Sequence, residues 1–432
     1  MKSAFSKVII LGGILTLISN IAVAEVFLPG MQPKEAGIEF AKVQQCRMCH
    51  AGTKNKDADP FVSWQSGIIS ISAKDPIFRA ALAIANQDIE GIGEFCLRCH
   101  APRAWLEGRS TPTDGSTLNT EDMYGISCTV CHSYIDPLSA EAAKIIKDVP
   151  PGHGNAMMVS DPQNVVREPY GDGKGAMPHE VLKSPFHTSS NLCGVCHNIS
   201  NPLLAEDVKK QPPTFSVIFS ELTANGCSAI LQNAARTEAA SHAITGRLMA
   251  EGRRMWVNAV FLGSSGKVLK EIGKYAEKDD TIFGESVKAP TLLDPEQTRV
   301  YEILFGISEA QAKKYSVKPG KSFHSVLNDT ILKDNRIPPE GFSNAAFREH
   351  LSQPVGATYA DGQYWDEFEL DLPEGCKKVV VRLMYESVSW EYLKFLAEEN
   401  KTNDLGKRLY DVWTKTGKCP PTVMVTIEKS VE

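Results

Sequence analysis

Hydrophobic positions in the first half of this chain come in short, scattered runs. The clearest helix signal is Asp75-Pro76 followed by apolar residues up to Ile84. An aspartate followed by a proline is typical of a helix N-cap and first turn. A further helix is predicted over Pro33–Gln45. Glycine and proline recur between residues 150 and 178, which indicates a long loop.

The second half shows a period of two. Apolar side chains alternate along 379–386 and 423–428, which predicts half-buried strands, and 254–262 is a third candidate strand. Helices are predicted over 214–242, 390–397 and 405–416. We interpret residues 213–432 as a β-rich, sandwich-like domain with helical insertions. Since the first half is mainly helical, the predicted fold class is α+β.

The N-terminus has the pattern of a secretory signal. Residues 1–24 contain Lys2 and Lys7, then an apolar run, then Ala22-Val23-Ala24 as a cleavage site. An uncleaved membrane anchor is the alternative, but the apolar run is short and broken by glycines. We find no second candidate span. The sequence therefore predicts a periplasmic or extracellular protein with no stable membrane span after cleavage.

Length and composition are those of a globular protein. The chain has 432 residues, of which 42% are hydrophobic and 23% charged, which excludes disordered, collagen-like and many-span membrane proteins. The formal net charge is −6 and no long basic run occurs. Nucleic-acid binding therefore has no electrostatic support.

Eight of the 11 cysteines fall into four identical Cys-x-x-Cys-His motifs. This is the attachment signature of c-type haem, in which two thiols bond the porphyrin and the histidine ligates the iron. We predict four covalently attached haems. The predicted attachment residues are Cys46, Cys49, Cys96, Cys99, Cys128, Cys131, Cys193 and Cys196, with His50, His100, His132 and His197 as proximal ligands.

Two other chemistries use similar residues. Zinc sites combine cysteine and histidine, but zinc knuckles are usually paired at close spacing, whereas these motif histidines lie 50, 32 and 65 residues apart. Thiol redox chemistry requires neither the histidine nor four copies. Four complete motifs in an exported chain favour haem.

Six histidines lie outside the motifs. His153 sits in a Pro-Pro-Gly-His-Gly loop, and His179 and His187 precede the fourth motif, so these three are the first candidates for distal iron ligands. His242 is the candidate for the fourth, with His324 as an alternative. Further candidates are Met157, Met158, Met177 and a ligand from a neighbouring subunit.

Three cysteines remain outside the motifs. Cys376 and Cys419 are candidates for a disulfide in the C-terminal half, since an exported protein can keep one. Cys227 then stays unpaired, as a buried thiol or a reactive one.

Several segments resemble exported tetrahaem cytochromes c of nitrifying and metal-reducing bacteria. They are Phe95–His100 with Trp105–Gly108, Ser184–His187 leading into the fourth motif, Glu251–Trp256 and Asp334–Pro339. The resemblance implies a haem domain of short helices and loops over 25–212, followed by a sandwich-type domain over 213–432. It also implies electron transfer as the default function, and for some such proteins assembly into filaments.

The leading hypothesis is therefore an electron carrier rather than an enzyme. Four haems would relay electrons between donor and acceptor proteins of a respiratory or extracellular chain. One alternative is a haem enzyme that converts a small nitrogen or sulfur compound at an open iron. Another is a homo-oligomer, a filament subunit or a component of a larger electron-transfer complex.

Overall fold

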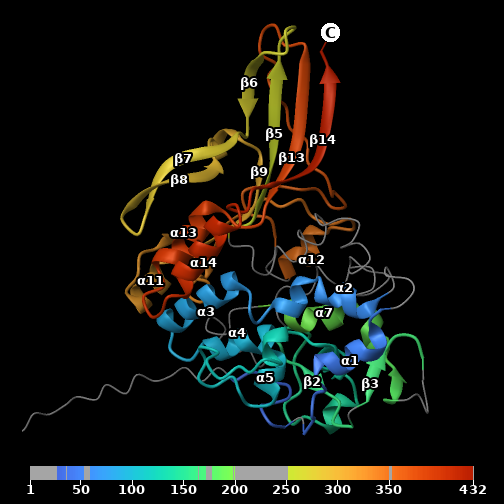
Figure 1. The fold of residues 1–432 in the computed structure, drawn as a ribbon. Coiled ribbons are helices and arrows are strands. Elements are labelled where there is room, and N and C mark those ends of the chain that lie inside the picture. The colour runs from blue at the N-terminus through green and yellow to red at the C-terminus, as the bar shows by residue number, and fades with distance from the viewer. Residues whose placement is uncertain are drawn as a thin grey trace, which may run out of the picture.

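The computed structural model describes residues 27–35, 37–52, 59–163, 165–171, 178–197, 199, 252–349 and 353–431. Short helices pack together in the N-terminal part, and a long-stranded sheet projects from the C-terminal part (Figure 1). This combination agrees with the predicted α+β class. The predicted signal segment 1–24, the boundary near residue 212, the helix predicted over 214–242 and His242 lie outside the described residues.

The N-terminal part consists of short helices joined by loops, as predicted. The helices are α1 (Val43–His50), α2 (Pro60–Gln65), η2 (Ile68–Ile71), α3 (Pro76–Asp88), α4 (Gly93–His100), α5 (Pro102–Leu106), η3 (Asp122–Tyr124), α6 (Cys128–His132), η4 (Ala142–Lys144), η5 (Pro185–Thr188) and α7 (Ser190–His197). Two small strand pairs accompany them: β1 (Tyr134–Ile135) with β2 (Val159–Ser160), and β3 (Val166–Glu168) with β4 (Val181–Lys183).

The helix predicted over residues 33–45 is wrong. No helix occurs among the described residues from 33 to 42, and α1 begins only at Val43. Lys34 and Gly37 have φ values of 68° and 60°, which a right-handed helix excludes. The chain instead runs in turns and extended backbone up to the first motif.

The helix predicted after Asp75 is confirmed as α3. The Asp75 side chain accepts a hydrogen bond from the backbone N–H of Ile77 at 3.0 Å, and Pro76 occupies the first helical position. Both features satisfy or remove N–H groups that a helix start leaves unpaired. Phe78, Leu82 and Ile84 on this helix are buried.

The three predicted strands form the main sheet of the C-terminal part. The strand order is β14 (Thr422–Ser430), β13 (Lys378–Glu386), β5 (Arg254–Leu262) and β6 (Val268–Ile272), with β9 (Val300–Tyr301) beside one end of β5. All neighbours are antiparallel.

Further elements surround the base of this sheet. They are the hairpin β7 (Tyr275–Ile282) and β8 (Glu285–Leu292), η6 (Pro295–Gln297), the sheet β11 (Gly320–Lys321), β10 (Ile303–Ile307) and β12 (Thr330–Asp334), and the helices α11 (Glu309–Tyr315), α12 (Asn344–Glu349), α13 (Trp390–Glu398) and α14 (Leu405–Lys415). The last two confirm the helices predicted at 390–397 and 405–416.

The strands of the C-terminal part do not form the sandwich that the sequence predicts. The five-stranded sheet projects from the body, and no second sheet of similar size covers it within the described residues (Figure 1). Apart from β9, the strands between 275 and 334 form a hairpin and a separate three-stranded sheet. The alternation in the sequence identifies strands, but it does not say which strands pair.

Helix α3 joins the two parts of the molecule. Its Ala80 and Ile84 pack in one apolar cluster with Leu393 of α13 and Trp413 of α14. The Gln87 side chain adds two hydrogen bonds to backbone beyond α13, at 3.0 and 2.8 Å. The helical part is therefore anchored to the C-terminal part by an apolar contact with a polar edge.

The disulfide predicted between Cys376 and Cys419 does not form. The buried thiol of Cys376 donates to the Lys378 carbonyl at the start of β13, whereas the Cys419 sulfur lies 3.1 Å from Oγ of Ser387 at its end. β13 is nine residues long, so roughly 30 Å separates the two thiols. Cys227 lies outside the described residues.

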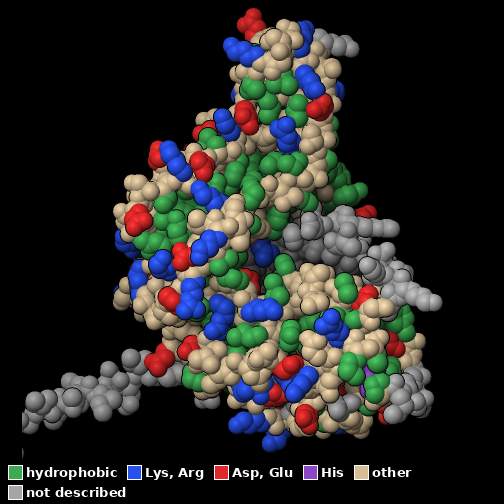
Figure 2. All heavy atoms as spheres, viewed as in Figure 1, with side chains coloured by type: hydrophobic (Ala, Val, Ile, Leu, Met, Phe, Trp, Pro, Cys, Tyr) green, Lys and Arg blue, Asp and Glu red, His purple; other side chains and the backbone are tan. Residues whose placement is uncertain are grey.

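The edge strands of the main sheet expose apolar side chains. Ile427 of β14 is 62% exposed, and hydrophobic surface is visible over the sheet in Figure 2. The other exposed members are Val268, Leu269, Val423 and Val425. Within the described residues, no helix has both the length and the apolar character needed to cross a membrane.

One buried ion pair ties β5 to β13. Arg254 Nε donates to Oε2 of Glu386 at 2.6 Å, and the Glu386 side chain is fully buried. Burial raises the pKa of Glu386 to about 7, although the Arg254 charge opposes the shift. The protonated form of Glu386 is therefore favoured more in the folded chain than in the unfolded one.

We predict that this pair makes stability depend on pH. The pKa of the Glu386 carboxyl rises from 4.5 to about 7 on folding. Its protonation therefore stabilises the folded chain fully below pH 4.5, and this contribution to the free energy of unfolding is lost as the pH rises through 7. The loss amounts to no more than about 3.5 kcal/mol, at about 1.4 kcal/mol per pKa unit. Denaturant unfolding between pH 4.5 and 8 measures it.

In Glu386→Gln this part of the pH dependence should disappear. Glu391→Gln is the matched control, because Glu391 is 44% exposed and contacts Arg254 only at 3.5 Å. Equal pH dependence in wild type and Glu386→Gln would contradict the prediction.

Candidate haem-attachment site

Each Cys-x-x-Cys-His motif forms the end of a short helix. α1, α4 and α7 each have eight residues and end at His50, His100 and His197, and α6 runs from Cys128 to His132. Side chains three and four positions apart share one helix face. The two thiols and the imidazole of a motif are therefore presented together.

The first and third motifs meet through their thiols. Cys46 on α1 and Cys128 on α6 share a side-chain hydrogen bond, which lowers the pKa of Cys46 to about 7 and raises that of Cys128. Burial raises the pKa of Cys131 to about 11. Two attachment sites far apart in the sequence thus lie side by side.

The second and fourth motifs meet in the same way. The thiols of Cys99 and Cys196 are hydrogen-bonded, and Sγ of Cys99 lies 3.9 Å from the Cys196 carbonyl oxygen. Burial raises the pKa of Cys96 to about 12. Cys193 is disulfide-bonded, so attachment of a haem to its sulfur would require that this disulfide be reduced first.

Backbone carbonyls orient two of the motif imidazoles. Nδ1 of His100 lies 3.2 Å from the Ser72 carbonyl oxygen, and Nδ1 of His132 lies 2.8 Å from that of Arg167. An Nδ1–H that donates to a carbonyl leaves the Nε2 lone pair for a metal. Burial lowers the pKa of His100 and His197 to about 4, which keeps both rings in the neutral, ligating form.

His179 faces the imidazole of the first motif. The ring centroids of His50 and His179 are 6.3 Å apart, with an interplanar angle of 19°. Histidine–metal bonds are about 2 Å long, so rings on opposite sides of one metal have centroids roughly 6 Å apart. Nδ1 of His179 is buried without a hydrogen-bond partner. This pair has the spacing of two axial ligands.

His187 faces the imidazole of the third motif. Its ring centroid is 5.7 Å from that of His132, at an angle of 15°. Nδ1 lies 2.9 Å from Oγ of Ser184, and Nε2 lies 3.1 Å from the Cys131 carbonyl oxygen. Burial lowers the pKa of His187 to about 4. To bind a metal, Nε2 would give up its contact with Cys131.

The other candidate ligands are held by different partners. His153 lies beside Gly194 of the fourth motif, but its Nε2 is 2.8 Å from Asp136. His324 pairs through Nδ1 with Asp88 of α3, at 2.8 Å. The sulfur of Met158 accepts a hydrogen bond from the Tyr134 hydroxyl.

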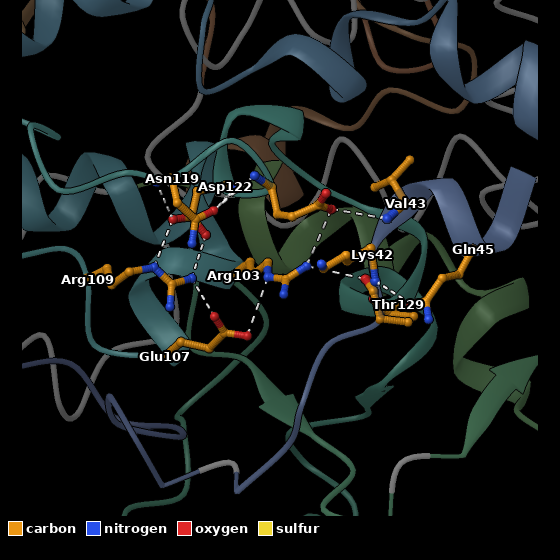
Figure 3. Close-up of polar contacts among 11 residues, drawn as sticks. Lys42, Val43, Gln45, Arg103, Glu107, Arg109, Asn119, Asp122 and Thr129 are labelled. Carbon is orange, nitrogen blue, oxygen red and sulfur yellow. Dashed lines mark hydrogen bonds and ion pairs between the residues drawn. The ribbon is translucent and has the colours of Figure 1, made fainter.

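A polar network fixes the helices of the first and third motifs (Figure 3). The side chain of Glu121, next to η3, accepts the N–H of Val43, the first residue of α1, at 3.1 Å. Arg103 of α5 lies 3.7 Å from the Glu121 carboxylate and donates to the Ala41 carbonyl at 3.2 Å. Thr129 of α6 donates to the same carbonyl at 3.5 Å. Both motif helices are thereby tied to one point.

The centre of this network is a buried bidentate pair. Arg109 donates to Asp122 from Nε at 2.9 Å and from Nη2 at 2.6 Å, and the Asp122 side chain is fully buried. Glu107 forms ion pairs with both Arg109 and Arg103, and its Oε1 lies 3.3 Å from Nε of Arg103. Planar bidentate pairs add geometric specificity as well as energy.

Some functional contacts have no signal in the sequence. The Ser72 and Arg167 carbonyls act through the backbone, which no side-chain motif reveals. The Phe78 ring stacks on His100 with centroids 3.8 Å apart. The apolar face of α3 is predictable from the sequence, but the helix that it covers is not.

Comparison with known proteins gives one distant similarity. No family model matches the chain, and no curated protein does either. A penta-heme cytochrome c552 from Thermochromatium tepidum has a similar structure, with a TM-score of 0.47 and 14% identity, over 93% of this chain and 100% of that one. This similarity is too distant to assign the chain to a family.

We predict that Asp122→Asn destabilises the helical part. Loss of the charged acceptor leaves Nε and Nη2 of Arg109 facing a neutral amide, which costs up to about 3 kcal/mol, with the remaining contact to Glu107 offsetting part of this cost. Asp411→Asn, in an exposed pair with Lys407, is the control and should cost less than about 0.5 kcal/mol. Denaturant unfolding measures both variants, and equal effects would show that the network has no special role.

Proposed function

We propose that this chain is an exported multihaem c-type cytochrome that carries electrons through four covalently bound haems. The observation that supports this is the convergence of the four motif helices into two couples, the first with the third and the second with the fourth. A relay requires its redox groups to be close together, and the thiol contacts bring the attachment points together in pairs.

The chain's own residues supply attachment, ligation and orientation. A bound haem supplies an iron that takes up and releases one electron. The eight motif thiols would hold the porphyrins, and His50, His100, His132 and His197 would ligate the irons. The Ser72 and Arg167 carbonyls would fix two of these rings by accepting the Nδ1 proton.

His179 and His187 are our proposed distal ligands for the first and third haems. Their rings lie 6.3 and 5.7 Å from those of His50 and His132. Two histidines close the iron to substrates and suit it to electron transfer. His153, beside the fourth motif, and His242 remain the proposals for the other two irons.

The sequence supports the proposed compartment and the proposed kind of partner. The basic, then apolar, then small-residue pattern of residues 1–24 supports export to the periplasm or beyond. The net charge of −6 favours donor and acceptor proteins with basic docking surfaces, and such docking should weaken as salt rises.

Carbon monoxide distinguishes this function from catalysis at an open iron. We predict that the reduced holoprotein keeps its optical spectrum when carbon monoxide is added, because closed six-coordinate irons have no position for it. A spectral change that corresponds to one haem in four would contradict the carrier function and favour an enzyme acting on a small nitrogen or sulfur compound.

The same measurement tests the ligands. His179→Ala and His187→Ala should each open one iron, so that about a quarter of the haem binds carbon monoxide. His324→Ala is the control, since His324 is paired with Asp88 and not with a motif imidazole. If the His179 and His187 variants resist carbon monoxide as the wild type does, these two assignments are wrong.

A further inference from the structure

A cationic side chain is buried inside the second motif. Arg98, between Leu97 and Cys99, is 3% exposed. Arginine is rarely buried unless it is paired with an acid. Within the described ranges, however, no carboxylate lies at ion-pair distance from Arg98. The nearby carboxylate of Glu94 is in contact with the Ser110 hydroxyl.

Neutral groups hold the guanidinium in place. Nη2 donates to the carbonyls of Pro29 and Ala156, at 3.4 and 3.2 Å, and the guanidinium carbon lies 4.1 Å from the centre of the Trp105 ring. Nε has no hydrogen-bond partner. A guanidinium stays charged at neutral pH in proteins. These contacts solvate the charge without neutralising it.

The other motifs show that the fold does not require arginine here. The residue before the second cysteine is Val130 in the third motif and Val195 in the fourth, and both are buried. In the first motif it is Met48, which is 80% exposed. Arg98 thus places a charge where the equivalent buried positions have an apolar side chain.

The charge lies where the second and fourth motifs meet. Ala156, whose carbonyl accepts a hydrogen bond from Arg98, donates its own backbone N–H to the carbonyl of Val195 in the fourth motif at 2.8 Å, and Cys99 beside Arg98 lies 3.9 Å from the Cys196 carbonyl oxygen. The thiols of Cys99 and Cys196 are both predicted haem attachment points. A charge in this buried position is screened little by solvent or salt.

We propose that Arg98 raises the reduction potential of haem held by the second and fourth motifs. This inference rests on the proposed function. Reduction adds one electron at an iron and removes one unit of positive charge, so a fixed neighbouring cation favours the reduced state. Arg98 would influence electron transfer through the electrostatic field of its charge, without itself binding the iron.

The test is an optical redox titration of the full-length holoprotein. In Arg98→Met at least one haem should titrate at a more negative potential, with its reduced-to-oxidised ratio about tenfold lower at a fixed potential, equal to 59 mV for one electron. Arg98→Lys keeps the charge and should retain most of the wild-type potential. Arg98→Gln is a second neutral variant in case the methionine variant does not fold.

Arg47→Met is the matched control. It makes the same substitution in the first motif, where Arg47 is exposed and solvent screens its charge, so a smaller shift is expected. The inference is overturned if the neutral Arg98 variants keep the wild-type potentials, if Arg98→Lys shifts as far as they do, or if Arg47→Met shifts as far as Arg98→Met. Covalent haem present without these shifts refutes only this inference, whereas a chain without covalent haem refutes the proposed function as well.

Discussion

The presentation of two thiols and one imidazole on a single helical turn is the constraint around which the helical part is built. Cys-x-x-Cys-His meets it only as a helix, since positions i, i+3 and i+4 share one face. All four motifs are helical, and each helix ends at its histidine. The loops between them, the α3 contact and the Arg109–Asp122 network bring these four helix ends together. The apolar clusters of this part pack directly against motif cysteines, namely Cys96, Cys99 and Cys196.

The burial of the motif helices also determines which charges remain inside the helical part. Burial that brings the second and fourth motifs together also keeps the imidazoles of His100 and His197 neutral and the thiol of Cys96 protonated. Any permanent charge left inside then acts at short range and without much screening. Arg98 is such a charge, whereas Arg103 and Arg109 are balanced by carboxylates. The same fold therefore contains arginines that stabilise helices and one that is placed to influence redox chemistry.

Local patterns in the sequence predict individual elements of the fold well. The period-two pattern predicts β13 and β14 to within two residues, the apolar run at 254–262 predicts β5, and Asp75-Pro76 predicts the start of α3. The failures are non-local. Lys34 and Gly37 adopt left-handed backbone that composition does not reveal. The separation of Cys376 from Cys419 by the length of β13 depends on strand pairing, as does the arrangement of strands that replaces the sandwich.

The site divides in the same way between local and non-local information. The spacing within the motifs is enough to predict the proposed attachment residues. The pairing of the motifs depends on tertiary packing, as do the positions of His179 over His50 and His187 over His132. The Asp136 partner of His153 lies 17 residues away in the sequence, and nothing in the Pro-Pro-Gly-His-Gly loop indicates it. The burial of Arg98 is equally hidden, because its neighbours in the motif resemble those of the exposed Arg47.

Covalent haem on all four motifs would add to the mass of the intact chain, which mass spectrometry under denaturing conditions measures. Exported protein from a host that matures c-type cytochromes should carry the mass of four haems that stay bound after unfolding. A chain that carries none, or that binds zinc through the same cysteines, would contradict the account.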